Sequence, residues 1–275
     1  MGNIFMRFPG GRAKALTLSY DDGVVQDIRL IEIMRRHGLK GTFNINSELY
    51  APEDPSYTGR RMTRAQVIET YTGSGMEVAA HAATHPFLEQ LPVNLCTLEV
   101  MQDRMNLERD FGCLIRGMAY PFGTYNDDVV AALKQCGIVY SRTTKSTEKF
   151  AIPTDWLRMP ATCHHKNPRL MELAKKFVEG PGKRGPELFY LWGHSYEFDD
   201  NDNWNVIEEF AQFMGGREEI WYATNIEIYD YVAAYNQLIF SMDQSLVHNP
   251  TATELYLNTK GKTYCVKPGE TLKLN

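Results

Sequence analysis

Short apolar runs alternate with amphipathic segments along most of the chain, between about residues 14 and 235. Apolar runs bounded by turn residues are typical of buried strands, and apolar positions recurring every three or four residues indicate helices. The pattern predicts strands at 15–20, 42–45, 77–80, 116–120, 138–142, 157–162, 187–193 and 220–224. It predicts helices at 25–37, 63–73, 94–110, 126–135, 168–179, 205–214 and 226–238.

This alternation amounts to about eight β/α repeats without sequence identity between them. It indicates the α/β class, with parallel strands wrapped by helices as a barrel or an open sheet. In either arrangement a functional site is expected at the carboxyl ends of the strands.

The pattern changes after about residue 241. Short alternating segments such as 254–257 and 263–266 follow, with Pro268 and Gly269 as a turn. A segment this short cannot bury a core of its own, so we expect a small antiparallel β appendage packed against the main domain. The predicted organisation is a catalytic domain at 1–240 and an appendage at 241–275.

The composition excludes some partners. The net charge of -5 over 275 residues gives no basic field for nucleic acid or anionic membrane. We find no run long enough to span a membrane and no signal-peptide core near the start, so we expect a cytoplasmic protein. The oligomeric state stays open. The odd number of scattered cysteines favours reduced thiols: Cys96, Cys113, Cys136, Cys163 and Cys265.

Two carboxylates, Asp21 and Asp22, directly follow the first predicted strand, and Gly23 permits a sharp turn there. Neighbouring side chains diverge at a strand end, so both carboxylates cannot point at one atom. We expect one to bind a metal and the other to act as a base. The alternative is a helix cap with a carboxylate near the helix dipole.

Two histidines, His81 and His85, lie four residues apart after another strand. On a helical turn this spacing places both imidazoles on one side. Two solvent-facing loop histidines are the alternative. Together with Asp22 they form a ligand set suited to a divalent metal and to metal-assisted hydrolysis.

These motifs resemble the polysaccharide deacetylases of the NodB-homology type, also called carbohydrate esterase family 4. The family motif T-F-D-D-G is present as residues 19–23, and H-[ST]-x-x-H as residues 81–85, with Ala82 replacing Ser or Thr. The resemblance implies a distorted (β/α) barrel of seven or eight repeats. It also implies one divalent metal, Zn²⁺ before Co²⁺ or Ni²⁺, bound by Asp22, His81 and His85, with Asp21 as the general base.

The third family motif departs from its pattern. Its arginine, which orients the base in the family, is replaced by Ala119, and its tyrosine by Phe122. The resemblance assigns the Phe122 backbone N–H to the oxyanion, a role that needs no side chain. Arg158, beside Asp155, is the expected replacement for the arginine, because Arg116 lies too far along its strand. An ordinary surface charge is the alternative for both arginines.

The remaining motifs concern the acid and the substrate. His194 corresponds to the general acid of the family, and Glu197 would orient it; the alternative is a buried histidine satisfied by the backbone. His164 and His165 follow a strand end and would face the groove. For the aromatic residues a place in the core is the alternative to stacking on sugar. The expected substrate contacts are Tyr20, Tyr120, Trp156, Trp192 and Glu197.

The sequence therefore predicts a metal-dependent hydrolase that removes acetyl groups from N- or O-acetylated carbohydrate. One alternative is an amidase for a small N-acyl substrate such as a free N-acyl sugar. Another is a non-catalytic glycan-binding protein, because the motif-three arginine is missing.

Overall fold

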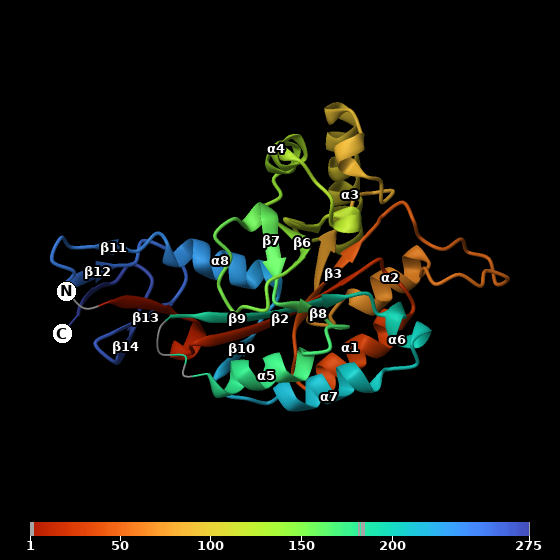
Figure 1. The fold of residues 1–275 in the computed structure, drawn as a ribbon. Helices are drawn as coiled ribbons and strands as arrows, with labels where there is room; N and C mark the ends of the chain where they lie inside the picture. Colours follow the sequence, from red (N-terminus) through yellow and green to blue (C-terminus); the bar gives the residue numbers. More distant parts are fainter. Residues whose placement is uncertain (1–2, 181, 183–184, 275) are drawn as a thin grey trace.

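The structure is a computed structural model that describes residues 3–180, 182 and 185–274. A parallel sheet forms its centre, in the order β7-β6-β5-β4-β3-β2-β9-β8, with β10 paired to β2 (Figure 1). Its strands are β2 (Lys14–Asp21), β3 (Gly41–Ile45), β4 (Glu77–Ala80), β5 (Gly117–Ala119), β6 (Tyr140–Ser146), β7 (Met159–Ala161), β8 (Cys163–His164), β9 (Glu187–Gly193) and β10 (Ile220–Tyr222).

The sheet curves into the distorted barrel that the sequence predicts. Its two end strands, β7 and β8, are separated in sequence by Thr162 alone, although β7 pairs with β6 and β8 with β9. Within the described residues no ladder joins β7 to β8, so strand pairing does not close the barrel. All eight residues of β2 are buried, as expected for a central parallel strand covered on both faces.

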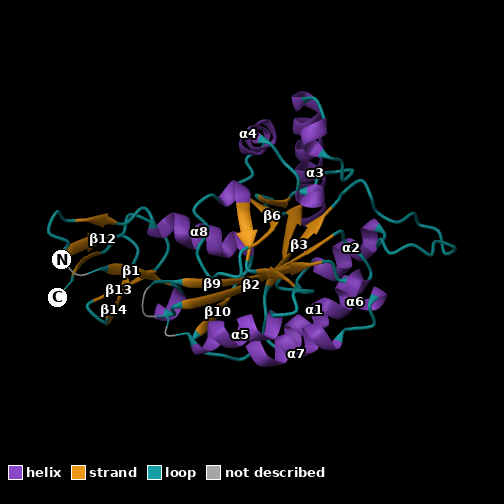
Figure 2. Ribbon diagram, in the orientation of Figure 1, coloured by secondary structure: helices purple, strands orange, loops and turns teal. Residues whose placement is uncertain are grey.

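Helices cover the sheet on several sides (Figure 2). The helices are α1 (Gln26–Arg36), α2 (Arg64–Tyr71), α3 (Val93–Phe111), α4 (Asp127–Gln135), α5 (Leu170–Glu179), α6 (Tyr196–Asp200), α7 (Asn205–Met214) and α8 (Asn225–Tyr235). Thr63 and Gln66 form a capping box at the start of α2, and Gly112 ends α3 in the left-handed region. None of the described helices is long and apolar enough to cross a membrane.

Two short elements differ from the prediction. The predicted strand at 157–162 begins as the 3-10 helix η4 (Trp156–Arg158), because the Asp155 carboxylate accepts a hydrogen bond from the Leu157 N–H and caps it. Helix α6, which the sequence did not predict, follows β9 directly.

The tail forms two three-stranded antiparallel sheets beside the barrel (Figures 1 and 2). One contains β1 (Ile4–Arg7), β13 (Leu255–Thr259) and β14 (Lys262–Val266), and the other β11 (Ile239–Phe240), β12 (Leu246–His248) and β15 (Thr271–Lys273). A β appendage is thus present, but it includes β1 from the other end of the chain. The predicted boundary at residue 240 falls at the end of β11, which already pairs with β12.

The Tyr231 hydroxyl joins α8 to the tail. It donates to the Arg7 carbonyl (2.7 Å) and accepts from the Tyr256 N–H (3.0 Å). Tyr231→Phe should lower the free energy of unfolding by about 1–3 kcal/mol, because it leaves the Tyr256 N–H without a partner. Urea titration checks this, with the exposed Tyr57→Phe as control. Equal stability of the two variants would contradict it.

Candidate metal and acid–base site

The carboxyl ends of the central strands carry the predicted chemistry. Asp21 is the last residue of β2, His81 follows β4, and His194 follows β9. Because parallel strands end at the same edge of the sheet, these side chains meet there. Asp22, His81 and His85 each offer one ligand atom, and these atoms lie within 4.8 Å of one another.

The histidine pair is held by a loop, not by the helical turn that the spacing predicted. Ala82 and His85 have φ angles of 59° and 55°, and Asp22 has a φ of 87°. These left-handed conformations are uncommon for residues other than glycine. They turn the side chains of two separate loops toward one another.

The histidines are in the state that metal binding requires. His81 Nδ1 lies 2.8 Å from the Ala119 carbonyl, which can only accept, so Nδ1 carries the proton and Nε2 presents its lone pair. Burial lowers the pKa of His81, and burial with the neighbouring His81 lowers the pKa of His85 to about 4. Both imidazoles are therefore neutral near pH 7, and the donor set fits a divalent cation such as Zn²⁺.

Asp21 is a buried carboxylate with two partners. Arg142 Nη2, from β6, donates to Oδ2, and Asn44 Nδ2, from β3, donates to Oδ1 at 2.8 Å. Burial alone would raise the pKa of Asp21, but the charge of Arg142 and the nearby imidazoles outweigh it and lower the pKa to about 2. The Trp192 ring packs over the Arg142 guanidinium at 4.3 Å.

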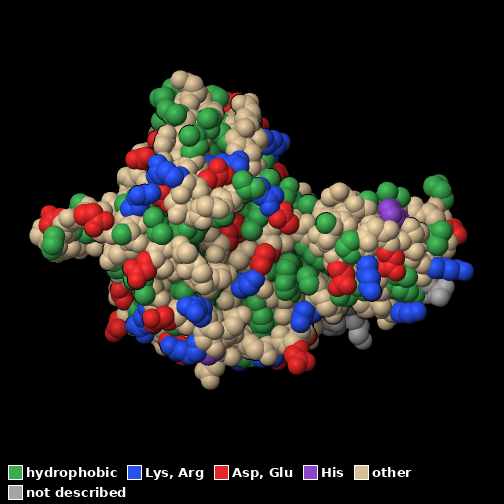
Figure 3. Space-filling view, turned by 180° about the vertical axis from the view of Figure 1, so that it is seen from behind, with side chains coloured by type: hydrophobic (Ala, Val, Ile, Leu, Met, Phe, Trp, Pro, Cys, Tyr) green, Lys and Arg blue, Asp and Glu red, His purple; other side chains and the backbone are tan. Residues whose placement is uncertain are grey.

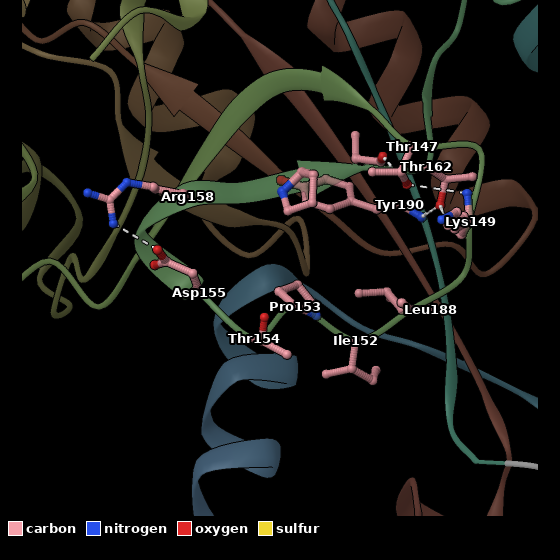
Figure 4. A pocket seen from close by; sticks show the side chains of 13 residues that line it. Thr147, Lys149, Ile152, Pro153, Thr154, Asp155, Arg158, Thr162, Leu188 and Tyr190 are labelled. Atoms are coloured by element: carbon pink, nitrogen blue, oxygen red, sulfur yellow. Dashed lines mark hydrogen bonds and ion pairs between the residues drawn. The ribbon is translucent and has the colours of Figure 1, made fainter. Parts of the chain in front are cut away.

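The expectation that Arg158 orients Asp21 is wrong. Arg158 forms ion pairs with Asp155 (2.8 Å) and Asp127 (2.5 Å) instead. Asp155 and Arg158 both line a pocket of about 320 Å³ between the 147–158 loop, β7 and β9 (Figure 4). Arg142 contacts Asp21 in its place, and this contact was not predicted from the sequence. A charged residue at the end of an apolar strand segment was the available signal.

His194 lies between carboxylates. Its Nε2 is 3.8 Å from Asp21 Oδ2 and 4.0 Å from Asp22 Oδ2, and its Nδ1 is 3.7 Å from Glu197 Oε1. Burial lowers the pKa of His194, but the contact with Glu197 and the two aspartates outweigh it and raise the pKa. The protonated imidazolium is favoured, which suits a proton donor.

Glu197 also contacts a second cluster of polar side chains. Its Oε2 is 3.2 Å from His164 Nε2 and 3.0 Å from His165 Nε2, and its Oε1 is 2.9 Å from Lys166 Nζ. The Lys166 N–H donates to His164 Nδ1 at 3.1 Å, so a neutral His164 carries its proton on Nε2. That nitrogen then has no lone pair for a metal, and the cluster is a polar network around Glu197.

Three expected substrate contacts lie elsewhere. Tyr20 is buried and stacks on His165, at a ring distance of 5.8 Å. Tyr120 is buried, and its hydroxyl donates to the Leu157 carbonyl. Trp156 packs edge-on against a tyrosine of α8. Tyr20 and Tyr120 therefore belong to the core, whereas Trp156 is half-buried.

Phe122 lies at the exposed edge of the candidate site. It is 51% exposed, stacks on Phe87 with a ring distance of 3.9 Å, and meets the His85 ring at 4.5 Å. It belongs to the 3-10 helix η3 (Pro121–Gly123), and N–H groups in a first helical turn have no partner within the helix. An oxyanion role for this N–H stays a prediction.

The molecular surface differs in character between its parts. Apolar side chains gather over α3, seen at the top of the rear view (Figure 3). The exposed ones are Val93, Leu95, Leu98, Met101 and Met105.

All five cysteines are free thiols.

Asp27 lies under the site and gives a pH-dependent prediction. Its carboxyl accepts from Ser195 Oγ (2.5 Å), the Tyr71 hydroxyl (2.6 Å) and the Val24 N–H (3.1 Å). Burial raises its pKa from 3.8 to about 7. A raised pKa contributes stability below pH 3.8, and this stability is lost as the pH rises through about 7.

Asp27→Asn should remove this dependence. The difference in free energy of unfolding, wild type minus variant, should fall by about 4 kcal/mol between pH 4 and pH 8. Urea titrations at several pH values measure it, with the exposed Glu53→Gln as control. A difference that does not change with pH would contradict the assignment.

Comparisons with known proteins concern the family and the fold of the chain. The family model for polysaccharide deacetylases matches residues 9–141, which include Asp21, Asp22, His81 and His85. A search of curated proteins found no match.

Two solved structures share the fold, and a third matches part of the chain. A candidate polysaccharide deacetylase from Mycobacterium smegmatis has a TM-score of 0.62 at 15% identity, over 86% of this chain and 96% of that chain. A Bacillus anthracis family 4 pseudoenzyme, mutated to restore activity, has a TM-score of 0.50 at 16% identity, over 81% and 69%. A Streptococcus pyogenes deacetylase in complex with acetate has a TM-score of 0.42 at 23% identity. That match covers 46% of this chain and only 55% of that chain.

The polysaccharide deacetylase model matches residues 9–141, which contain the first two motifs, so the resemblance predicted from the motifs is confirmed for this part of the chain.

Proposed function

We propose that the protein is a metal-dependent deacetylase of acetylated carbohydrate. The observation that carries the proposal is the donor set of Asp22 and the neutral His81 and His85 imidazoles beside an ionised, arginine-paired Asp21. Bound there, a divalent cation would supply Lewis-acid chemistry. It would polarise the acetyl carbonyl and lower the pKa of water from about 16 to about 7.

The side chains of the chain divide the remaining work. Asp21 accepts a proton from the attacking water, and Arg142 and Asn44 hold its carboxylate in place. The Phe122 N–H donates to the oxygen of the attacked carbonyl. His194 gives its proton to the leaving sugar nitrogen or oxygen as the bond to the acetyl carbon breaks. The products are acetate and a free amine or hydroxyl.

The position of Arg142 weakens the alternative of a non-catalytic glycan-binding protein. That alternative was considered because Ala119 replaces the motif arginine. Ala119 and Arg142 are paired residues on neighbouring strands, so a guanidinium still reaches Asp21. One structurally similar protein is described as a pseudoenzyme. A non-catalytic binding protein is therefore one of the outcomes of the mutation experiment that follows.

The roles of Asp21 and the ligands can be separated by mutation. Asp21→Asn should lose nearly all acetate release from N-acetylglucosamine oligomers yet keep bound zinc. His81→Ala should lose both, since it removes a ligand. Metal content is measured by elemental analysis, and acetate by an enzymatic assay. Full activity in Asp21→Asn would sink the base assignment, and metal without any acyl release in the wild type would favour a binding module.

A matched pair of variants tests the positioning of the base. Arg142→Lys keeps the charge but cannot reproduce the guanidinium geometry, so kcat should fall by about 100-fold with little change in KM. Arg158→Lys, which alters the exposed ion pairs, should leave kcat unchanged. Equal effects of the two substitutions on kcat would contradict the assignment.

A further inference from the structure

Arg61 contacts the candidate metal ligand Asp22 at two atoms. Its Nη1 donates to the Asp22 carbonyl oxygen, and its Nη2 lies 3.1 Å from Asp22 Oδ1. Nη1 also donates to Asn46 Oδ1 at 2.9 Å. The planar guanidinium thus fixes both the backbone and the carboxylate of Asp22 in one orientation.

Asn46 extends this contact to the histidine loop. Its side chain is buried, and Nδ2 donates to the carbonyls of His81 (2.6 Å) and Ala82 (2.8 Å). Arg61 and Asn46, here called the Arg61–Asn46 bridge, therefore join the aspartate loop to the histidine loop. Strand β3 lies between the two loops, and its Asn44 and Ile45 carbonyls accept from the N–H groups of Asp22 (2.9 Å) and His81 (3.0 Å). The bridge adds side-chain hydrogen bonds beyond the end of β3.

Both loops contain strained backbone that the bridge holds. Asp22 and Ala82 have positive φ angles, and the carbonyls of these two residues accept hydrogen bonds from the bridge. Such conformations persist only where surrounding contacts over-determine them. The bridge therefore supports the backbone at two strained positions in the loops that carry the candidate ligands.

Arg61 is itself fixed by the backbone. The backbones of Val24 and Arg61 pair in antiparallel fashion, and the Met62 N–H donates to the Gly23 carbonyl at 3.3 Å. The preceding residue, Arg60, forms a two-bond ion pair with Asp200 of α6. Residues 60–62, at the end of the long loop between β3 and α2, therefore lie beside the candidate site (Figure 1).

We propose that Arg61 is a positioning residue for the metal site, which holds Asp22 and, through Asn46, the His81–Ala82 backbone in the binding geometry before a cation arrives. The inference rests on the proposed function. Two effects of Arg61 oppose each other: its contacts preorganise the ligands, whereas its positive charge repels a cation. Their opposite signs make the proposal measurable.

The experiment is Zn²⁺ binding to the metal-free protein, measured by competition with a chromophoric chelator. Arg61→Met removes donors and charge, and Arg61→Lys keeps the charge but loses the two-pronged contact. Both should bind zinc about 10–100-fold more weakly than wild type. Arg36→Met, which removes an exposed arginine paired with Glu208, is the control and should bind like wild type.

Unchanged or tighter zinc binding in Arg61→Met would overturn the proposal, because charge repulsion would then be the dominant effect. A second readout needs no metal: amide hydrogen exchange at residues 80–85 in the apo protein. Both Arg61 variants should exchange there at least about 10-fold faster, and unchanged rates would also overturn the proposal. A wild type that binds no zinc would sink the proposed function, whereas the exchange rates would still decide whether Arg61 holds the loop.

Discussion

The ion pair between Asp21 and Arg142 is the interaction on which the candidate site depends. The two side chains are only 3% and 1% exposed. A lone carboxylate in such a place loses several kcal/mol of hydration and would take up a proton. Arg142 supplies the compensating charge, and Asn44 donates to the other oxygen. The carboxylate can therefore stay ionised at the edge of the sheet, which a proton acceptor requires.

The two halves of the site are stabilised by different means. The Asp21 half lies on strands, where ladder hydrogen bonds fix the backbone and side chains from β3 and β6 reach inward. The candidate metal-binding half lies on loops with left-handed residues, so its geometry depends on side-chain hydrogen bonds such as those of Arg61 and Asn46. Substitutions on the strands should therefore act on the charge of the base, and those on the loops on ligand geometry.

The sequence could predict the parts of the site that depend on local order. Asp21 ends β2, while Asp22, His81 and His194 directly follow strands, and parallel strands bring such positions to one edge. It could not predict Arg142, because that contact depends on which strands are neighbours and on how far the sheet curves. Aromatic residues were the least predictable class, since the same pattern serves a core or a groove.

The register of β5 and β6 explains how the site can form without its motif arginine. Ala119 pairs with Arg142 in the parallel ladder, so the two positions lie at the same height on adjacent strands. An arginine side chain is long enough to span the difference of one strand, and the Trp192 ring supports its guanidinium. Arg158 cannot substitute, because it lies beyond the following loop between two carboxylates. The physical requirement is thus a cation at one point in space, and the sheet offers more than one sequence position from which to meet it.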